Sequence, residues 1–354
     1  MHKRIIFTVA KQNGIDLPDL AAAIANKAGL LNTYAFFRKK LTKSQVAVLI
    51  YHRVRPKKDN WSLEPMSPES FEKQIKYFSR NYEIIPLDSL AEGIKQGNGI
   101  PSKAVVITFD DGYKDNYTYA YPTLKKYNVP ATIFLTTGLI GTGNLFWWDK
   151  VKYIVSHTTS NQLSLDPLGN YPTQSDREKI HTAVVIVNSF KQLTEENRSL
   201  MITKLHKISG VNIPGDLGKE LILSWDEVRE MNDDGVVFGA HSVNHPILTN
   251  MPLEQAKWEI LQSKKDIEEK LGKKVTSFAY PNGDFNYMIS KFVKENSFIQ
   301  AFSVSGKLIS SRADPYELSR IEGIEDFNKF MIAFCGLWGD ARKILSGRMA
   351  KGRK

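Results

Sequence analysis

Two adjacent carboxylates, Asp110 and Asp111, are the residues whose types and spacing point most directly to chemistry. They follow a run rich in β-branched side chains, Ala104 to Phe109, and Gly112 comes directly after them. This pattern predicts a buried strand that turns at the glycine, with both carboxylates at its carboxyl end. Neighbouring carboxylates ionise at a high cost unless a cation or strong hydrogen-bond donors share the site. A bound metal ion meets that need, although Asp is also common in turns and helix caps.

Two histidines four residues apart, His241 and His245, follow a second apolar run, Val236 to Ala240. If the first turn after that strand is helical, the two imidazoles converge on one ion. One carboxylate and two histidines leave coordination positions open for water and substrate. Such an arrangement is typical of a catalytic metal site and not of a structural one.

The segments T-F-D-D-G at 108–112 and H-S-V-N-H at 241–245 together resemble the first two motifs of the NodB-like polysaccharide deacetylases, carbohydrate esterase family 4. A third segment, F-A-Y-P-N-G at 278–283, resembles that family's third motif, with Ala279 where an arginine is usual. The resemblance runs from about residue 45 to 322 and is broken by one insertion. It implies an α/β fold, a distorted (β/α) barrel of the polysaccharide deacetylase type with a helical insertion.

The resemblance also implies a role for each matching residue. Asp111, His241 and His245 would hold a divalent ion, for which zinc is expected, and Asp110 would be the general base. The third motif would contact the substrate and the oxyanion through Tyr280, Pro281 and Asn282, with the backbone N–H of Asn282 as an oxyanion donor. Arg320, or alternatively Arg53, is the candidate to replace the missing third-motif arginine.

The general acid is expected at His52, which follows the apolar run Val46 to Tyr51. The segment Y-H-R-V resembles the exopolysaccharide deacetylase subgroup, in which the acid histidine precedes the T-F-D-D-G motif. No histidine follows His245, where the rest of the family carries this residue. A structural histidine beside Tyr51 is the alternative interpretation.

The predicted function is metal-dependent removal of acetyl groups from N-acetylated sugars of a polysaccharide or glycan intermediate. Two alternatives use the same barrel. One is a catalytically silent carbohydrate-binding or scaffold protein, and the other is a metal-dependent esterase or amidase that acts on another acyl substrate.

Strands that alternate with helices through short links must position these residues, and this order predicts parallel βα units. About eight strand candidates fit a closed or nearly closed barrel, with the chemistry at the carboxyl ends of the strands. We expect this barrel over residues 46–326. An insertion at 141–221 interrupts it and opens near Trp147 and Trp148, which either stack on sugars or tie the insertion to the barrel.

Charge is concentrated at the two ends of the chain. Residues 1–45 carry eight Lys and Arg against two Asp, and residues 327–354 carry seven against one. We interpret the first as a basic amphipathic helix and the second as a basic amphipathic tail. Both are expected to contact an anionic membrane surface, or else to pack on the barrel, and we expect no nucleic-acid partner. The single cysteine, Cys335, excludes a disulfide framework within the chain. With no signal-peptide pattern or long apolar run, a cytoplasmic location is expected.

Overall fold

The computed structural model describes residues 45–56, 66–96, 101 and 103–334. Its centre is a nine-stranded, mostly parallel sheet with the strand order β10-β1-β3-β4-β7-β8-β9, to which β11 adds beside β1 and β2 beside β3. The strands of this sheet are β1 (Gln45–Tyr51), β2 (Glu83–Ile84), β3 (Ala104–Phe109), β4 (Ala131–Leu135), β7 (Val237–Ala240), β8 (Ser277–Ala279), β9 (Gln300–Phe302), β10 (Ile309–Ser310) and β11 (Ile321–Glu322).

The sheet is strongly curled, because one segment bridges its two ends. Leu318 pairs with Phe302 of β9, and Ile321 pairs with Leu49 of β1. The predicted distorted barrel is therefore confirmed. The pairing of β10 with β1 is antiparallel, and the sequence did not predict this strand because it is only two residues long.

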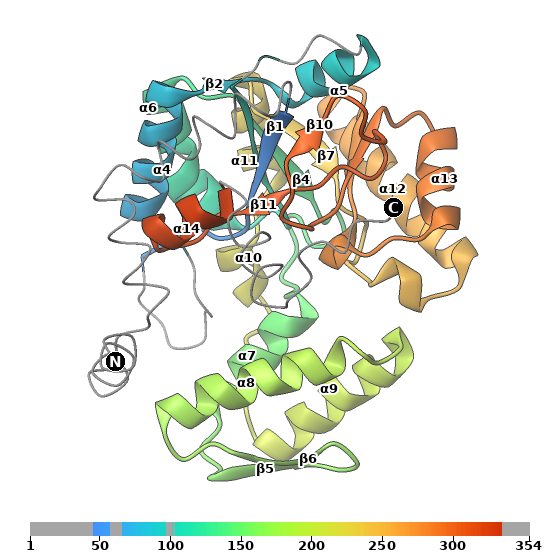
Figure 1. The fold of residues 1–354 in the computed structure, drawn as a ribbon. Helices are drawn as coiled ribbons and strands as arrows, with labels where there is room; N and C mark the ends of the chain where they lie inside the picture. Colours follow the sequence, from blue (N-terminus) through green and yellow to red (C-terminus); the bar gives the residue numbers. More distant parts are fainter. Residues whose placement is uncertain (1–44, 57–65, 97–100, 102, 335–354) are drawn as a thin grey trace, which may run out of the picture.

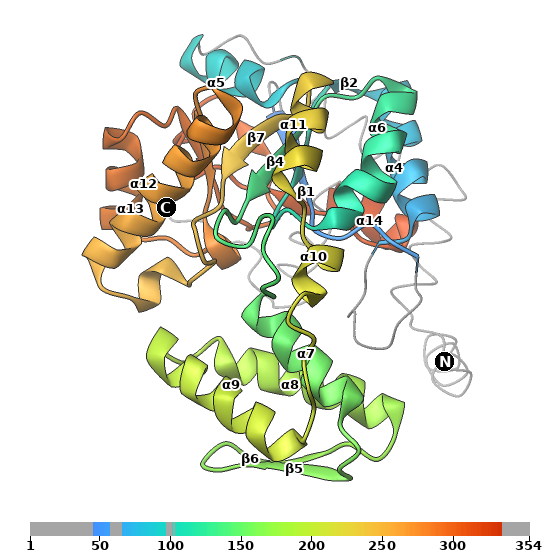
Figure 2. The same ribbon diagram turned by 180° about the vertical axis from the view of Figure 1, so that it is seen from behind.

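Helices cover the outside of the sheet, with α4 and α6 on one side and α12 and α13 on the other (Figures 1 and 2). Helix α4 shows how the sequence forms them: Ser67 caps the first turn by accepting from the N–H of Ser70, and Phe71, Ile75 and Phe78 are buried on one face. The barrel helices are α4 (Pro68–Asn81), α5 (Leu87–Gln96), η1 (Asn116–Ala120), α6 (Tyr121–Tyr127), α11 (Trp225–Asp233), η2 (Leu248–Asn250), α12 (Leu253–Leu271), η3 (Pro281–Gly283), α13 (Tyr287–Glu295) and α14 (Phe327–Phe334).

The insertion forms a separate body below the barrel in Figure 1, next to the carboxyl ends of the strands. It has an apolar core of its own, in which Ile154, Ile186, Phe190 and Leu205 are fully buried. Its elements are α7 (Trp147–His157), β5 (Gln162–Leu165), β6 (Gly169–Pro172), α8 (Asp176–Phe190) and α9 (Glu195–Ser209). The chain then returns to the barrel through α10 (Leu217–Leu221), whose Leu217 and Leu221 pack against the barrel core. Strands β5 and β6 pair in an antiparallel hairpin that the sequence analysis did not predict.

The first eight residues of the predicted basic tail form α14, which belongs to the barrel core. Phe330, Met331 and Phe334 are buried, and the rings of Phe330 and Phe334 lie 5.8 and 5.0 Å from that of Phe78 on α4. The rest of this tail and the predicted N-terminal helix lie outside the described residues. Within the described ranges, no helix has both the length and the apolar character needed to cross a membrane.

The strand register brings the motifs to one edge of the sheet. Tyr51 of β1 is aligned with Phe109 of β3, and Ala240 of β7 is aligned with Leu135 of β4 and Phe278 of β8. The residues that follow these strands therefore emerge together at their carboxyl ends, the edge where barrels of this kind carry their active sites.

Candidate active site

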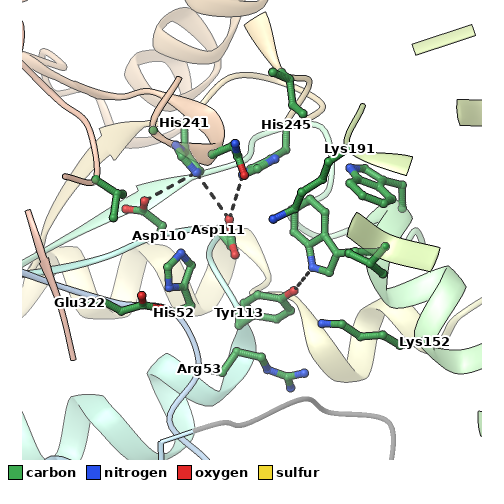
Figure 3. A pocket seen from close by; sticks show the side chains of 17 residues that line it. His52, Arg53, Asp110, Asp111, Tyr113, Lys152, Lys191, His241, His245 and Glu322 are labelled. Atoms are coloured by element: carbon green, nitrogen blue, oxygen red, sulfur yellow. Dashed lines mark hydrogen bonds and ion pairs between the residues drawn. The ribbon is translucent and has the colours of Figure 1, made fainter. Parts of the chain in front are cut away.

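A cavity of about 440 Å³ lies at this edge, between the barrel and the insertion. Its volume is in the range of about 300–1,000 Å³ found for small-molecule sites. The barrel contributes the two aspartates, the three predicted histidines and Asn282, and Figure 3 shows most of them around one central space. The insertion supplies the facing wall through Trp147, Trp148, Lys152 and Lys191.

Asp111, His241 and His245 converge on one point, as the sequence predicted. The Oδ1 atom of Asp111 lies 3.5 Å from Nε2 of His241 and 3.4 Å from Nε2 of His245. Ligands at about 2.0–2.2 Å from a tetrahedral zinc ion are separated from one another by about 3.3–3.6 Å. Oδ1 of Asp111 is also buried without a hydrogen-bond partner among the described protein atoms. The ligand atoms of the three side chains all lie within 4.8 Å of one another, so the three residues fit a single divalent ion.

The backbone reaches this geometry through left-handed conformations and not through a helical turn. Asp111, Ser242, His245 and Asn282 have φ of 76°, 64°, 55° and 59°. The expectation of a helical turn after the His241 strand is thus wrong, because the left-handed conformations at Ser242 and His245 bring the second imidazole back to the first. Such backbone costs on the order of 1–3 kcal/mol per residue and is concentrated at functional sites.

Two contacts orient the histidines. Nδ1 of His241 lies 2.8 Å from the carbonyl of Ala279 and donates to it, which leaves Nε2 free to face the ion. The loop before His245 is held by the buried carboxylate of Glu259 on α12, which accepts from the backbone N–H groups of Val243 and Asn244 at 2.7 and 2.9 Å. Glu259 was not predicted, because on the sequence it is one more acid of an amphipathic helix.

Asp110 is bound by Arg320. The two terminal nitrogens of Arg320 each donate to one carboxylate oxygen of Asp110 at 2.6 Å, and the guanidinium is fully buried. Burial alone would raise the pKa of Asp110, but the guanidinium holds this pKa below its usual value. Arg53, the other candidate for this position, instead pairs with Asp115 at 2.8 Å.

The electrostatics of the triad suit a cation. Burial alone would raise the pKa of Asp111, but the two neighbouring imidazoles hold it well below its usual value. Burial and the proximity of His241 lower the pKa of His245 to about 3. Burial opposes the charged form of His241 as well, but the two carboxylates outweigh it and raise the pKa of this residue. Asp111 and His245 thus have the protonation states that metal binding needs, and a bound ion would have to displace the proton that the two carboxylates favour on His241.

His52 lines the cavity on the side opposite the insertion, next to Asp110 and Glu322 in Figure 3. Its carbonyl accepts from the side chain of Asn116 at 2.8 Å, and Asp115 accepts from the next two residues along the chain. The loop that carries His52 is therefore fixed to the start of η1. This fixes the position of the imidazole at the wall of the cavity.

The side chains of the third motif lie mostly outside the cavity. The side chain of Tyr280 is fully buried, stacks on Phe285 and donates its hydroxyl to the carbonyl of Tyr316, so it points away from the cavity. Pro281 is buried as well. Arg320, which was also predicted among the substrate- and oxyanion-binding residues, binds Asp110 and is not among the residues that line the cavity. Of the predicted substrate contacts, Asn282 lines the cavity.

Of the two roles that the sequence left open for the tryptophans, the structure shows the tie to the barrel, through Trp148. Nε1 of Trp148 donates to the hydroxyl of Tyr113 at 2.9 Å, and this hydroxyl donates to Asp149 at 2.7 Å, which ties the insertion to the barrel. The Trp148 ring also lies 4.6 Å from that of His245 and lines the cavity. Lys152 and Lys191 were missed, because nothing in their spacing distinguishes them from surface lysines.

The sheet is curled and mostly parallel, and its strand ends carry an Asp-His-His cluster and a second aspartate that is bound by an arginine. These features define the class of metal-dependent α/β hydrolases. The family model described as polysaccharide deacetylase matches residues 97–299, more than half of the chain. The chain belongs to this family.

Sequence similarity to individual proteins supports the same family. The chain is 32% identical over 156 residues to YxkH of Bacillus subtilis (strain 168), which covers 43% of this chain and 54% of that protein. It is 33% identical over 129 residues to the poly-beta-1,6-N-acetyl-D-glucosamine N-deacetylase of Staphylococcus aureus (strain MSSA476), which covers 32% of this chain and 43% of that protein. The match thus spans about half the length of these curated relatives.

The fold also resembles solved structures. The deacetylase PplD of Streptococcus pyogenes, solved in complex with acetate, superimposes with a TM-score of 0.56 at 18% identity, over 82% of this chain and 98% of that chain. At this identity the likeness concerns the fold, a strongly curled and mostly parallel sheet.

Proposed function

We propose that this protein is a metal-dependent hydrolase that removes acetyl groups from N-acetylated sugars of a polysaccharide or glycan intermediate. One observation carries the proposal: Asp110, held by two 2.6 Å contacts to Arg320, lies 3.7 Å from His241 of the triad. A base carboxylate is therefore fixed next to a site for a Lewis acid. Membership of the deacetylase family supports acetylated sugars as substrates, and the printed name of the Staphylococcus aureus relative supports an N-acetyl group.

We propose zinc as the ion, because two imidazoles and one carboxylate are a common ligand set for catalytic zinc. A divalent ion held by Asp111, His241 and His245 would polarise the acetyl carbonyl and lower the pKa of a bound water to about 7.

We propose a role for each protein group in or next to the cavity, based on the family resemblance and on the position of the group. Asp110 takes the proton of the water that attacks the acetyl carbon, and Arg320 keeps its carboxylate ionised and oriented. His52, on the side of the cavity opposite the insertion, donates a proton to the departing nitrogen, since an amine anion is too basic to leave. The backbone N–H of Asn282 stabilises the negative charge on the carbonyl oxygen. The C–N bond breaks, and acetate and a free amine result.

The basic ends of the chain extend the proposal to the location of the protein. We infer that the protein is cytoplasmic and that the positive charge of its two ends attracts it to an anionic membrane surface. Sedimentation with vesicles of anionic and of zwitterionic lipid tests this. Equal binding to both vesicle types, or binding to neither, would contradict it.

Metal analysis of the purified full chain, combined with acetate release from N-acetylated chitooligosaccharides, tests the enzymatic proposal. We expect about one divalent ion per chain and release of acetate that a chelator abolishes and zinc restores. A protein that binds no metal and releases no acetate would instead be a silent scaffold. Release from aryl acetates without release from N-acetylated sugars would indicate the esterase alternative.

A further inference from the structure

Two lysines of the insertion face the active-site cavity. Lys152 lies on α7, and Lys191 follows the last residue of α8. Both line the cavity, and Figure 3 shows their side chains directed into it from the insertion side. The side chain of Lys152 is only 16% exposed. An ammonium group removed from water to this extent needs a compensating charge or hydrogen bonds.

The protein compensates the two ammonium groups unequally. Lys152 lies 3.6 Å from Asp149, whose other carboxylate oxygen accepts a short hydrogen bond from Tyr113. Lys191 forms no ion pair within the part of the chain that the structure describes. At least one ammonium group on the insertion wall therefore lacks an anionic partner.

The carboxylates of the barrel wall have other partners. Asp110 is bound by Arg320, and Asp111 faces the two imidazoles of the triad. Glu322 is exposed and lies on the His52 side of the cavity (Figure 3). A divalent ion at the triad would make the cavity still more positive. The excess positive charge is thus on the insertion side, facing the space that a substrate would fill.

Interaction with the dipole of a helix does not account for the positions of both lysines. Lys191 caps the C-terminus of α8, where a cation interacts favourably with the helix dipole. Lys152, however, lies in the second turn of α7, where the dipole favours no cation. What the two residues share is the cavity that both of them line.

We propose that the insertion forms a subsite for an anionic oxygen group, so that the substrate is an N-acetylated sugar that carries a phosphate or a carboxylate next to the acetylated ring. This inference rests on the proposed deacetylase function. Trp147 and Trp148 line the same wall, and their rings are held in place by Arg198, which lies 4.8 Å from the centre of the Trp147 ring, and by Phe146, which stacks on Trp148 at 4.4 Å. The lysines bind the charge, and the barrel carries out the chemistry.

The test compares substrates that differ in charge. In the zinc-loaded full chain, kcat/KM for acetate release is measured on methyl N-acetylglucosaminide, on N-acetylglucosamine 1-phosphate, and on a tetrasaccharide of alternating N-acetylglucosamine and glucuronate. The variants are Lys152→Gln, Lys191→Gln and the double substitution. Lys207→Gln is the matched control, because Lys207 is an exposed lysine of the same insertion and does not line the cavity.

We expect the wild type to prefer an anionic substrate, and we expect added salt to reduce this preference. Each lysine substitution should lower the ratio of anionic to neutral kcat/KM by about tenfold to a hundredfold, the loss expected for one charge-assisted hydrogen bond. Lys191→Arg should retain most of the ratio, and Lys207→Gln should leave it unchanged. Whichever of the phosphate and carboxylate substrates shows the larger loss identifies the anion.

A binding measurement separates this inference from the proposed function. Calorimetry with the Asp110→Asn protein and N-acetylglucosamine 1-phosphate reports binding without turnover, and the double lysine substitution should weaken it. If no substrate releases acetate but this lysine-dependent binding persists, the deacetylase proposal fails and the anionic subsite stands. If acetate is released and the substrate ratio is the same in the wild type and the double variant, the subsite is refuted and the deacetylase proposal stands.

Discussion

Replacing Arg320 with lysine tests the idea that a base carboxylate must be held in a fixed orientation. The arginine is fully buried and binds both oxygens of Asp110 at 2.6 Å, so its planar fork sets the carboxylate plane. A lysine keeps the positive charge but donates from a single nitrogen, so it cannot reproduce the two parallel contacts. The substitution should therefore remove about one charge-assisted hydrogen bond, which is worth about 1.5–3 kcal/mol. In activity, this corresponds to a loss of about tenfold to a hundredfold in kcat/KM.

Three measurements on Arg320→Lys separate orientation from a general loss of structure. We expect kcat/KM for acetate release to fall as above and the free energy of unfolding in urea to fall by a similar energy. Zinc content should not change, because Arg320 contacts none of the three ligands. In an Asp110→Asn background, the same substitution should cost less stability, since its partner charge is already absent. Wild-type kcat/KM in Arg320→Lys, or an equal stability cost in both backgrounds, would refute the reasoning.

Three further predictions concern the ligand, the acid and the loop. Asp111→Asn should abolish both metal retention and activity, whereas Asp110→Asn should keep the metal and lose turnover; equal metal loss in the two would overturn the assignment of ligand and base. His52→Ala should lower kcat on an amide substrate by about 10²- to 10⁴-fold and far less on an aryl acetate, whose leaving group needs no proton, and equal losses on both would show that His52 is structural. Glu259→Gln should weaken zinc binding about tenfold in a chelator competition, because the loop before the second histidine loses part of its support, while Glu254→Gln on the exposed face of the same helix should not; equal affinities in the two variants would contradict this.

Much of the site could be predicted from the sequence because its residues follow strands. A β-branched run such as Ala104 to Phe109 identifies a buried strand, and parallel strands place whatever follows them at one edge of the sheet. Asp110, His52 and His241 could therefore be assigned to one site although they are far apart in the chain. The triad distances of 3.4 and 3.5 Å agree with the predicted ligand set.

Other features depend on long-range packing and leave no local pattern. The left-handed conformations of Ser242 and His245 are imposed by the surrounding structure, since non-glycine residues rarely favour them. The role of Glu259 depends on where α12 packs, and its sequence context is that of an ordinary helix surface. Lys191 faces the cavity only because the insertion folds back over the strand ends. The orientation of the buried Tyr280 likewise follows from its packing against Phe285, and the motif alone suggested a substrate contact.

The departure from the third motif at Ala279 does not by itself indicate a silent enzyme. An arginine still reaches Asp110, but it comes from position 320, in the segment that bridges β9 and β1. A buried ion pair is often no more stabilising than apolar residues of the same volume, so stability alone gives little reason to place one in the core of a barrel. A scaffold that only needed the barrel would have no use for Asp110 and Arg320 in its interior. A catalytic base that must stay ionised beside a metal site does need such a buried partner. The Asp110–Arg320 pair therefore favours the enzymatic interpretation over the silent one.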